Sequence, residues 1–201
     1  MIRAVLVDVG GVLVRTENLK PRRQWERRFG MRDWELADLV FNNPVSRRAS
    51  VGQATWDDNW AEVARRLSLP PAELEALRRD FWKGDVWDED LIRYIASLRS
   101  RVKTGIISNA LPGAREHVAA QVGGANFDEM VFSYEEGVEK PDPEIYRRAL
   151  ARLGVQPAEA VFVDDMLPNV EGARAIGMFG IHFTHPARAR AEIEQLLNSH
   201  A

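Results

Sequence analysis

The feature of this sequence that most restricts its fold is an almost unbroken apolar run at its start, followed at once by an acidic residue. Residues 4–7 are all apolar, Asp8 comes next, and Gly10 and Gly11 follow it closely. Apolar runs without alternating polar residues are typical of central strands in parallel sheets, which are buried on both faces. In such sheets, ligands bind beyond the carboxyl ends of the strands. The run therefore predicts a central strand that delivers Asp8 to a functional edge, where the two glycines allow a close approach of the backbone.

The second half of the chain predicts the rest of such a sheet. From residue 88 onward, apolar segments alternate with segments of helical periodicity. Strands are predicted at residues 102–108, 129–133, 160–164 and 179–183, and helices at residues 88–98, 112–122, 143–153, 168–176 and 186–197. Repeated strand–helix units form parallel sheets with helices on both faces. The predicted fold class is therefore α/β, with a Rossmann-like, three-layer core built from residues 1–14 and 88–201.

Residues 15–87 interrupt this alternation with a helical segment. Its helices are predicted at residues 19–29, 33–41, 56–67 and 71–82, with residues 42–46 as a loop. All six tryptophans of the chain lie in this segment: Trp25, Trp34, Trp56, Trp60, Trp82 and Trp87. This concentration indicates a separate unit with its own aromatic core. We expect a separate α-helical unit that is inserted after the first strand.

Composition and charge exclude several classes of protein. The 201 residues are 45% hydrophobic and 28% charged, as in ordinary globular proteins, and the net charge of −3 gives no general attraction to nucleic acid or anionic membranes. The absence of cysteine excludes disulfides, thiolate catalysis and thiolate metal sites. No apolar run has the length of a membrane span, and the first run lacks the basic leader of a signal peptide. We expect a cytoplasmic protein without nucleic-acid or membrane partners.

Polar residues with chemical potential follow the predicted strands. Because the carboxyl ends of parallel strands meet at one edge of a sheet, we expect these side chains to converge there. They are Asp8, Ser108 with Asn109, Lys140 in the loop after the third strand, Asp164 with Asp165, and Asn169 one helical turn further on. An acid, a hydroxyl, a lysine and an acidic pair are thus predicted to share one site.

These residues stand in four motifs that resemble those of the haloacid dehalogenase-like hydrolase superfamily. The motifs are VDVGGVL at residues 7–13, IISN at 106–109, EKPDP at 139–143 and VDDMLPNV at 163–170. They occur in the order found in the superfamily, and the resemblance extends over the whole chain. A helical insertion between the first two motifs is similar to the subclass with a small helical cap.

The resemblance implies Mg²⁺-dependent phosphoryl transfer through a phosphoaspartyl intermediate. Asp8 would attack phosphorus, and Lys140 would relieve the repulsion between this carboxylate and the phosphate. Asp8, the main-chain carbonyl of Gly10, and Asp165 would supply oxygen ligands to Mg²⁺, which prefers about six of them in octahedral geometry. The substrate would be a small phosphorylated metabolite.

The remaining motif residues are implied to bind phosphate or to support the site. The Ser108 hydroxyl and the Asn109 amide would bind phosphate oxygens. Asp164 would orient its neighbour or pair with Lys140, and Asn169 would support the acidic pair from behind.

Gly10 departs from the usual pattern of the superfamily. Most of its phosphatases carry a second Asp at this position, which protonates the leaving alcohol and then activates water. General acid–base help of this kind is typically worth about 10²–10⁴-fold in rate. Three interpretations follow: a phosphatase, for example of a sugar phosphate; a catalytically weak binding or regulatory member of the fold; or a metal-independent 2-haloacid dehalogenase. The dehalogenases usually carry a bulky tyrosine at this position, so Gly10 and the acidic pair favour a metal-dependent site.

The predicted cap is locally basic. Residues 15–52 contain nine Lys or Arg against five Asp or Glu. An anionic substrate under the cap would be attracted by this charge. Arg47 and Arg48 are the candidates for a substrate contact, whereas His182 and His185 lie outside the motifs and are expected to be structural or at the surface. Both a monomer and a homodimer that pairs through the cap are compatible with the sequence.

Overall fold

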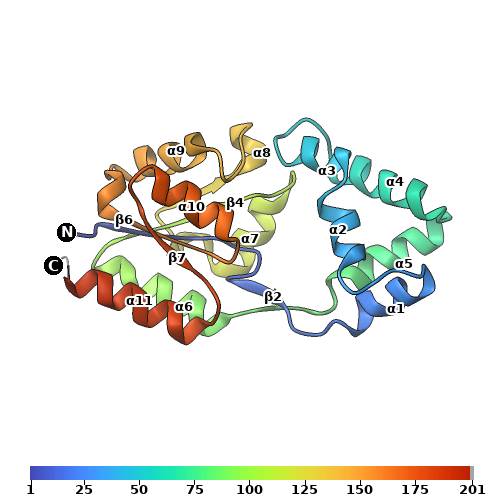
Figure 1. Ribbon diagram of the computed structural model, residues 1–201, viewed down its shortest axis with the longest axis horizontal. Helices are drawn as coiled ribbons and strands as arrows, with labels where there is room; N and C mark the ends of the chain where they lie inside the picture. The colour runs from blue at the N-terminus through green and yellow to red at the C-terminus, as the bar shows by residue number, and fades with distance from the viewer. Residues whose placement is uncertain (200–201) are drawn as a thin grey trace.

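The computed structural model describes residues 1–199 and contains a five-stranded parallel sheet with helices on both faces (Figure 1). The strand order is β5-β4-β1-β6-β7. The strands are β1 (Ala4–Val7), β4 (Lys103–Ser108), β5 (Glu129–Phe132), β6 (Ala160–Asp164) and β7 (Phe179–His182). This arrangement confirms the predicted α/β fold class with a Rossmann-like, three-layer core.

The first strand is central, as its sequence predicts. β1 pairs in parallel with β4 on one side and β6 on the other, and all four of its residues are buried. Val5 and Val7 pack on one face of the sheet, whereas Ala4 and Leu6 pack on the other. The run is continuously apolar because both faces are covered.

Each face of the sheet is covered by its own set of helices. Residues of α6 (Glu89–Ser97), α7 (Ala114–Val122) and α11 (Pro186–Ser199) pack with Val5 and Val7. Residues of α9 (Pro143–Leu153) and α10 (Leu167–Ala175) pack with Leu6. Short helical turns complete the core: α8 (Ser133–Glu136), η1 (Leu98–Ser100), η2 (Gly124–Asn126) and η3 (Pro157–Glu159). Within residues 1–199, no helix is long and apolar enough to cross a membrane.

The helices of residues 20–82 form a separate unit beside the carboxyl edge of the sheet, at the right of Figure 1. They are α1 (Lys20–Arg28), α2 (Glu35–Phe41), α3 (Pro44–Ala49), α4 (Trp56–Leu67) and α5 (Pro71–Trp82). Their buried core contains Trp25, Leu36, Val40, Trp60, Val63, Leu77 and Phe81. Of the six tryptophans, Trp25 and Trp60 belong to this buried core, whereas Trp34 and Trp82 are substantially exposed.

The predicted loop at residues 42–46 is wrong. α3 begins inside it, with Pro44 in the first helical turn and Asn43 as its N-cap. The Asn43 side chain accepts hydrogen bonds from the backbone N–H groups of Val45 and Ser46. Asn and Pro are both turn formers, and the same two residues also start helices, so the local pattern alone could not separate the two outcomes.

A two-stranded antiparallel ribbon joins the helical unit to the core. It consists of β2 (Val14–Thr16) and β3 (Asp85–Trp87). The buried side chain of Arg22 fastens the ribbon to the helices, since its guanidinium lies 2.8 Å from Asp85 and donates to the Phe81 carbonyl at 2.7 Å. The ribbon lies at the predicted junctions of core and insertion, and the division at residues 14 and 88 stays a prediction.

A second contact lies on the opposite side of the helical unit, where the turn after α3 meets the core near α8 (Figure 1). The Ser50 hydroxyl donates to the Glu139 carboxylate. Gly52 has a φ of +76°, and a Cβ there would lie 2.4 Å from the Tyr134 carbonyl oxygen. Glycine is therefore required for this close approach. The helical unit thus touches the core at two separated places around the sheet edge.

Candidate active site

The strand ends bring the predicted residues to one edge of the sheet. Asp8 directly follows β1, Ser108 ends β4, and Asp164 ends β6. Lys140 reaches this edge from the loop before α9. All of them except Asp164, together with Gly10, Asn109, Asp165 and Asn169, line a single cleft of about 1280 Å³ between the sheet edge and the helical unit.

Lys140 is the centre of the cluster. Its Nζ lies 2.8 Å from Asp8 Oδ1 and 2.7 Å from Asp164 Oδ2, and it donates to the Ile107 carbonyl at 2.9 Å. The side chain is completely buried. A buried ammonium group is tolerated only when it is paired and hydrogen-bonded. Two carboxylates from neighbouring strands therefore share one fixed cation.

Asn109 holds the backbone of Lys140 in place. Its side-chain oxygen accepts from the Lys140 N–H at 2.7 Å, and its side-chain NH₂ donates to the Lys140 carbonyl at 2.9 Å. The side chain is thus held in place within the protein. The main-chain N–H and the second N–H of the side chain remain available for the expected phosphate binding, beside the Ser108 hydroxyl that lines the cleft.

Asp164 has a supporting position behind the cleft. It is completely buried, and its carboxylate accepts from the Met166 N–H at 2.7 Å and from the Asn169 side chain at 3.1 Å. Asn169 is fixed in turn because its carbonyl accepts from the Tyr146 hydroxyl at 2.8 Å. Of the two alternatives for Asp164, the ion pair with Lys140 is therefore observed directly.

Three carboxylates could hold a metal ion. Within the described residues, Asp8, Asp164 and Asp165 each place one carboxylate oxygen within 4.8 Å of the others. Asp164 is already engaged by Lys140 and Asn169, which leaves Asp8 and Asp165 as the more available ligands. A set of hard oxygen donors suits Mg²⁺.

The three carboxylates and one lysine leave the site with an excess of negative charge. Burial raises the pKa of Asp8 to about 7, although the nearby Lys140 opposes this effect. Burial also raises the pKa of Asp165, and the charge of Asp164 adds to the effect. Both carboxylates are thus destabilised in their ionised form, as expected when like charges share a buried site. A divalent cation would relieve this repulsion.

Two adjacent glycines near Asp8 have different surroundings. Gly11 has a φ of +74°, and a Cβ there would lie 2.2 Å from Asp165 Oδ2. At Gly10, apart from the residue itself and its two chain neighbours, no heavy atom of residues 1–199 lies within 4 Å of the position that a Cβ would take. The space that a second carboxylate would use is therefore open to the cleft.

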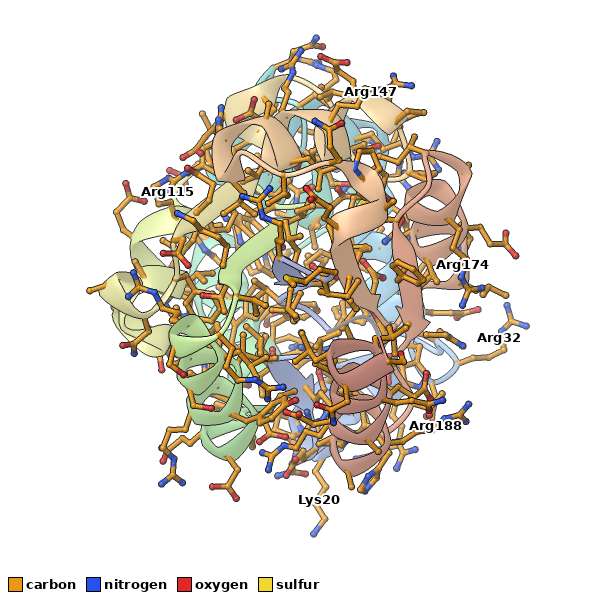
Figure 2. The ribbon with its side chains drawn as sticks, turned by 90° about the vertical axis from the view of Figure 1, so that its left-hand side faces the viewer. Lys20, Arg32, Arg115, Arg147, Arg174 and Arg188 are labelled. Atoms are coloured by element: carbon orange, nitrogen blue, oxygen red, sulfur yellow. The ribbon has the colours of Figure 1, made fainter. Side chains whose placement is uncertain are left out.

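The structure separates the two candidate arginines. Arg47 lines the cleft. Arg48 does not, and its guanidinium donates to the Gln53 carbonyl at 3.2 Å. Some basic side chains of the helical unit point away from the cleft, and Figure 2 shows Lys20 and Arg32 at the outline of the molecule. Arg48 bonds to its own loop, and a substrate contact from either arginine stays a prediction.

The two histidines near the last strand lie outside the cleft. The His182 ring Nε2 lies 2.9 Å from the Asp165 carbonyl oxygen, so it braces the backbone of the acidic pair. His185 lies at the amino end of α11, where its ring accepts from the Ala187 N–H at 3.2 Å. Both positions agree with a structural role.

Sequence reasoning missed the cleft residues that the helical unit and α7 contribute. They include Phe41, Asn42, Ser46, Ser50, Trp56, Trp60, Glu75, Arg78, Arg79 and Trp82 on the helical side, and His117 on α7. The spacing of Trp56 and Trp60 on one face of a helix is the sequence signal that could have indicated an aromatic surface.

A family model for haloacid dehalogenase-like hydrolases matches residues 2–177 of the chain. The chain belongs to the haloacid dehalogenase-like hydrolase family. It is therefore a hydrolase, and the four motifs that form the cleft floor are those of its family.

Relatives of similar length include two phosphatases. The chain is 26% identical to the sesquiterpene phosphatase astK of Aspergillus oryzae, over 97% of this chain and 96% of that protein. It is 27% identical to a validoxylamine A 7'-phosphate phosphatase of Streptomyces hygroscopicus, over 98% of this chain and 93% of that protein. A Bacteroides thetaiotaomicron enzyme of the family, crystallised with magnesium and inorganic phosphate, has the same fold, with a TM-score of 0.75 at 17% identity over 92% of this chain and 95% of that chain.

Proposed function

We propose that this hydrolase is a Mg²⁺-dependent phosphatase that acts on a small phosphorylated metabolite through a phosphoaspartyl intermediate on Asp8. The observation that carries the proposal is the position of Asp8 between one buried cation and one further carboxylate. Asp8 lies 2.8 Å from Lys140, and its carboxylate and that of Asp165 can reach a common metal ion. The phosphatase activities of the two relatives of similar length support the same reaction.

The residues divide the reaction into two displacements at phosphorus. In the first, an Asp8 oxygen forms a bond to phosphorus, the bond between phosphorus and the alcohol oxygen breaks, and the alcohol leaves with a proton. In the second, water attacks phosphorus, and the bond to Asp8 breaks, which releases inorganic phosphate and restores the carboxylate. Two easier steps replace one difficult hydrolysis.

The surrounding groups hold the phosphate and balance its charge. Ser108 and the Asn109 main-chain N–H would donate hydrogen bonds to phosphate oxygens, and Lys140 would compensate their negative charge. Mg²⁺ held by Asp8, Asp165 and the Gly10 carbonyl would polarise the phosphate and reduce its repulsion with the nucleophile. Asp164 and Asn169 would act through Lys140, by keeping its ammonium group at the cleft floor.

Gly10 supports a second candidate, a catalytically weak member of the family that mainly binds a phosphorylated ligand. The position lacks a carboxylate for proton transfer, and its surroundings are open. Without this group, the leaving alcohol takes its proton from water or from another side chain of the cleft. A metal-independent dehalogenase is less favoured, because the three clustered carboxylates suit a cation better than a halocarboxylate substrate.

The test is a phosphate-release assay on sugar phosphates and nucleotides, with and without Mg²⁺. Asp8→Asn should lower turnover by about 10³-fold or more, because it removes the nucleophile. Asp33→Asn, which removes a carboxylate from an exposed ion pair with Arg23, is the matched control and should retain activity. Turnover that survives Asp8→Asn, or that is unchanged by chelation of the metal, would contradict the proposed mechanism.

The same assays separate the alternatives. Ligand affinity without turnover on any substrate would indicate the binding protein. Metal-independent release of halide from 2-chloropropionate would indicate the dehalogenase.

A further inference from the structure

The helical side of the cleft carries a connected surface of aromatic rings, which we call the aromatic wall: Phe41, Trp56, Trp60 and Trp82. The rings come from α2, α4 and α5 and contact one another in sequence. The ring centroids of Phe41 and Trp82 lie 6.0 Å apart, and those of Trp56 and Trp82 lie 5.8 Å apart. These edge-to-face arrangements fix the rings relative to one another. The wall is a rigid surface, built before any ligand binds.

The wall is more than the core of the helical unit. Trp60 is buried, but Phe41 and Trp82 each leave 42% of their surface exposed. Across the cleft, Met166 follows the acidic pair and is 55% exposed. Three of the seven exposed large apolar side chains of residues 1–199 therefore line this one cleft. Apolar side chains gathered in a concave site mark a surface that binds an apolar ligand.

The basic residues near the wall suit the phosphate end of a substrate. Arg78 is paired with Asp57 and Glu75, and its guanidinium lies 5.8 Å from the Trp60 ring centroid. Arg47 and Arg79 add positive charge, which suits a phosphate. A hydroxyl that faces the ring surfaces themselves would lose hydrogen bonds to water without a replacement, and this loss is costly.

We propose that the natural substrate is the phosphate monoester of a large hydrophobic alcohol, whose hydrocarbon group packs between the aromatic wall and Met166. This inference rests on the proposed function, since it places the phosphate at Asp8. It narrows the expected metabolite from sugar phosphates to esters of hydrocarbon alcohols large enough to cover the aromatic wall. The substrate spans the cleft, with its charged end on the sheet edge and its apolar end on the helical unit.

The test uses n-alkyl phosphates of increasing chain length, with glucose 6-phosphate and AMP as polar comparisons. Dissociation constants are measured by calorimetry on the Asp8→Asn protein with Mg²⁺, so that no turnover is needed. Affinity should rise by about threefold for each added methylene until the wall is covered, because each buried methylene contributes a nearly constant free energy. Glucose 6-phosphate and AMP should bind no more tightly than the shortest alkyl phosphate.

Substitutions then locate the apolar end. Trp82→Ala should weaken binding of the longest alkyl phosphate by about 10- to 100-fold and leave inorganic phosphate unaffected. Trp34→Ala is the matched control, since Trp34 is an exposed tryptophan of the same unit, outside the cleft. If Trp82→Ala fails to fold, Met166→Gln takes its place. It keeps the length of an exposed side chain on the α/β core and should weaken binding of the longest alkyl phosphate by a smaller factor.

Each outcome decides the proposal. No dependence on chain length, tighter binding of glucose 6-phosphate or AMP, or equal effects of Trp82→Ala and Trp34→Ala would overturn it. Chain-length-dependent binding in a protein that never releases phosphate would uphold the hydrophobic ligand and contradict the proposed phosphatase activity. Mg²⁺-dependent hydrolysis of glucose 6-phosphate with the same efficiency as the long alkyl ester would uphold the phosphatase activity and contradict the hydrophobic substrate.

Discussion

Replacing Gly10 with Asp should add a proton-transfer group to the site without disturbing the fold. Apart from Gly10 and its two chain neighbours, no heavy atom of residues 1–199 lies within 4 Å of the Cβ position, and Gly10 is not among the glycines with positive φ. The substitution therefore introduces neither a clash nor a strained backbone. Steric strain should therefore contribute little to the free energy of unfolding, and any loss of stability without Mg²⁺ would come from the negative charge that the new carboxylate adds to the site.

The size of the gain depends on the leaving group. General acid catalysis is typically worth about 10²–10⁴-fold, which corresponds to about 3–5 kcal/mol of barrier. Alkyl alcohols leave as very basic alkoxides unless they are protonated, so Gly10→Asp should raise kcat/KM for an alkyl phosphate by about 10²-fold. p-Nitrophenolate is a weak base and leaves without a proton. For p-nitrophenyl phosphate, the rate of the step that releases p-nitrophenolate should therefore change by no more than about threefold.

The assay compares phosphate release from both esters by the wild type, Gly10→Asp and Gly10→Asn at saturating Mg²⁺. Asn has the shape of Asp and cannot exchange a proton at neutral pH, which makes it the matched control. An equal gain for Gly10→Asn, or no selective gain for the alkyl ester, would refute the reasoning, because proton transfer at this position would then not limit the reaction.

Three further predictions concern the surroundings of the site. Gly11→Ala should lower Mg²⁺ affinity by at least about tenfold in calorimetry, because its Cβ would displace the Asp165 carboxylate and its positive φ would cost about 1–2 kcal/mol; unchanged affinity would refute the close contact. In the metal-free protein, burial raises the pKa of Asp8 from 3.8 to about 7, so the folded state holds this proton more tightly than the unfolded state does. The stability of the wild type should therefore fall as the pH rises from about 4 to about 7. Urea denaturation should show that Asp8→Asn is the more stable protein at pH 8, and equal pH profiles of the two proteins would contradict this prediction. Arg22→Met should lower the free energy of unfolding by about 2–4 kcal/mol because it breaks a buried ion pair. Arg23→Met, which breaks an exposed ion pair, should lower it by about 0.5 kcal/mol or less. Similar losses for the two variants would contradict a stabilising role of Arg22 between the ribbon and the helices.

The sheet and its edge could be predicted because their signals are local. The uninterrupted apolar sequence of β1 indicates burial on both faces of the sheet. Asp8, Ser108 and Asp164 each stand at the end of an apolar run. The rule that strand ends meet at one edge then brings them together without any knowledge of distances. Local patterns were sufficient where the topology was regular.

The rest could not be predicted because it depends on contacts between distant residues. β2 and β3 are three residues each and are separated by about seventy positions, so neither has a pattern of its own. The hydrogen bonds of the Asn109 side chain are made to the backbone of Lys140, which lies in another loop, so the sequence around Asn109 does not indicate them. Which tryptophans face the cleft depends on how the five helices pack, and helical periodicity does not fix that packing.

The ribbon of β2 and β3 also has an evolutionary consequence. Because the two strands pair with each other, the insertion leaves the core and returns to it at adjacent points. Any folded unit whose ends meet at this spacing could replace the helices without a change in the sheet, as for domain insertions in general. On the proposed substrate binding, the sheet edge would carry out the chemistry, and the exchangeable helical unit would make most of the contacts that choose the molecule. A chimaera that exchanges the residues between β2 and β3 with those of a relative should carry the relative's substrate preference on this protein's catalytic core.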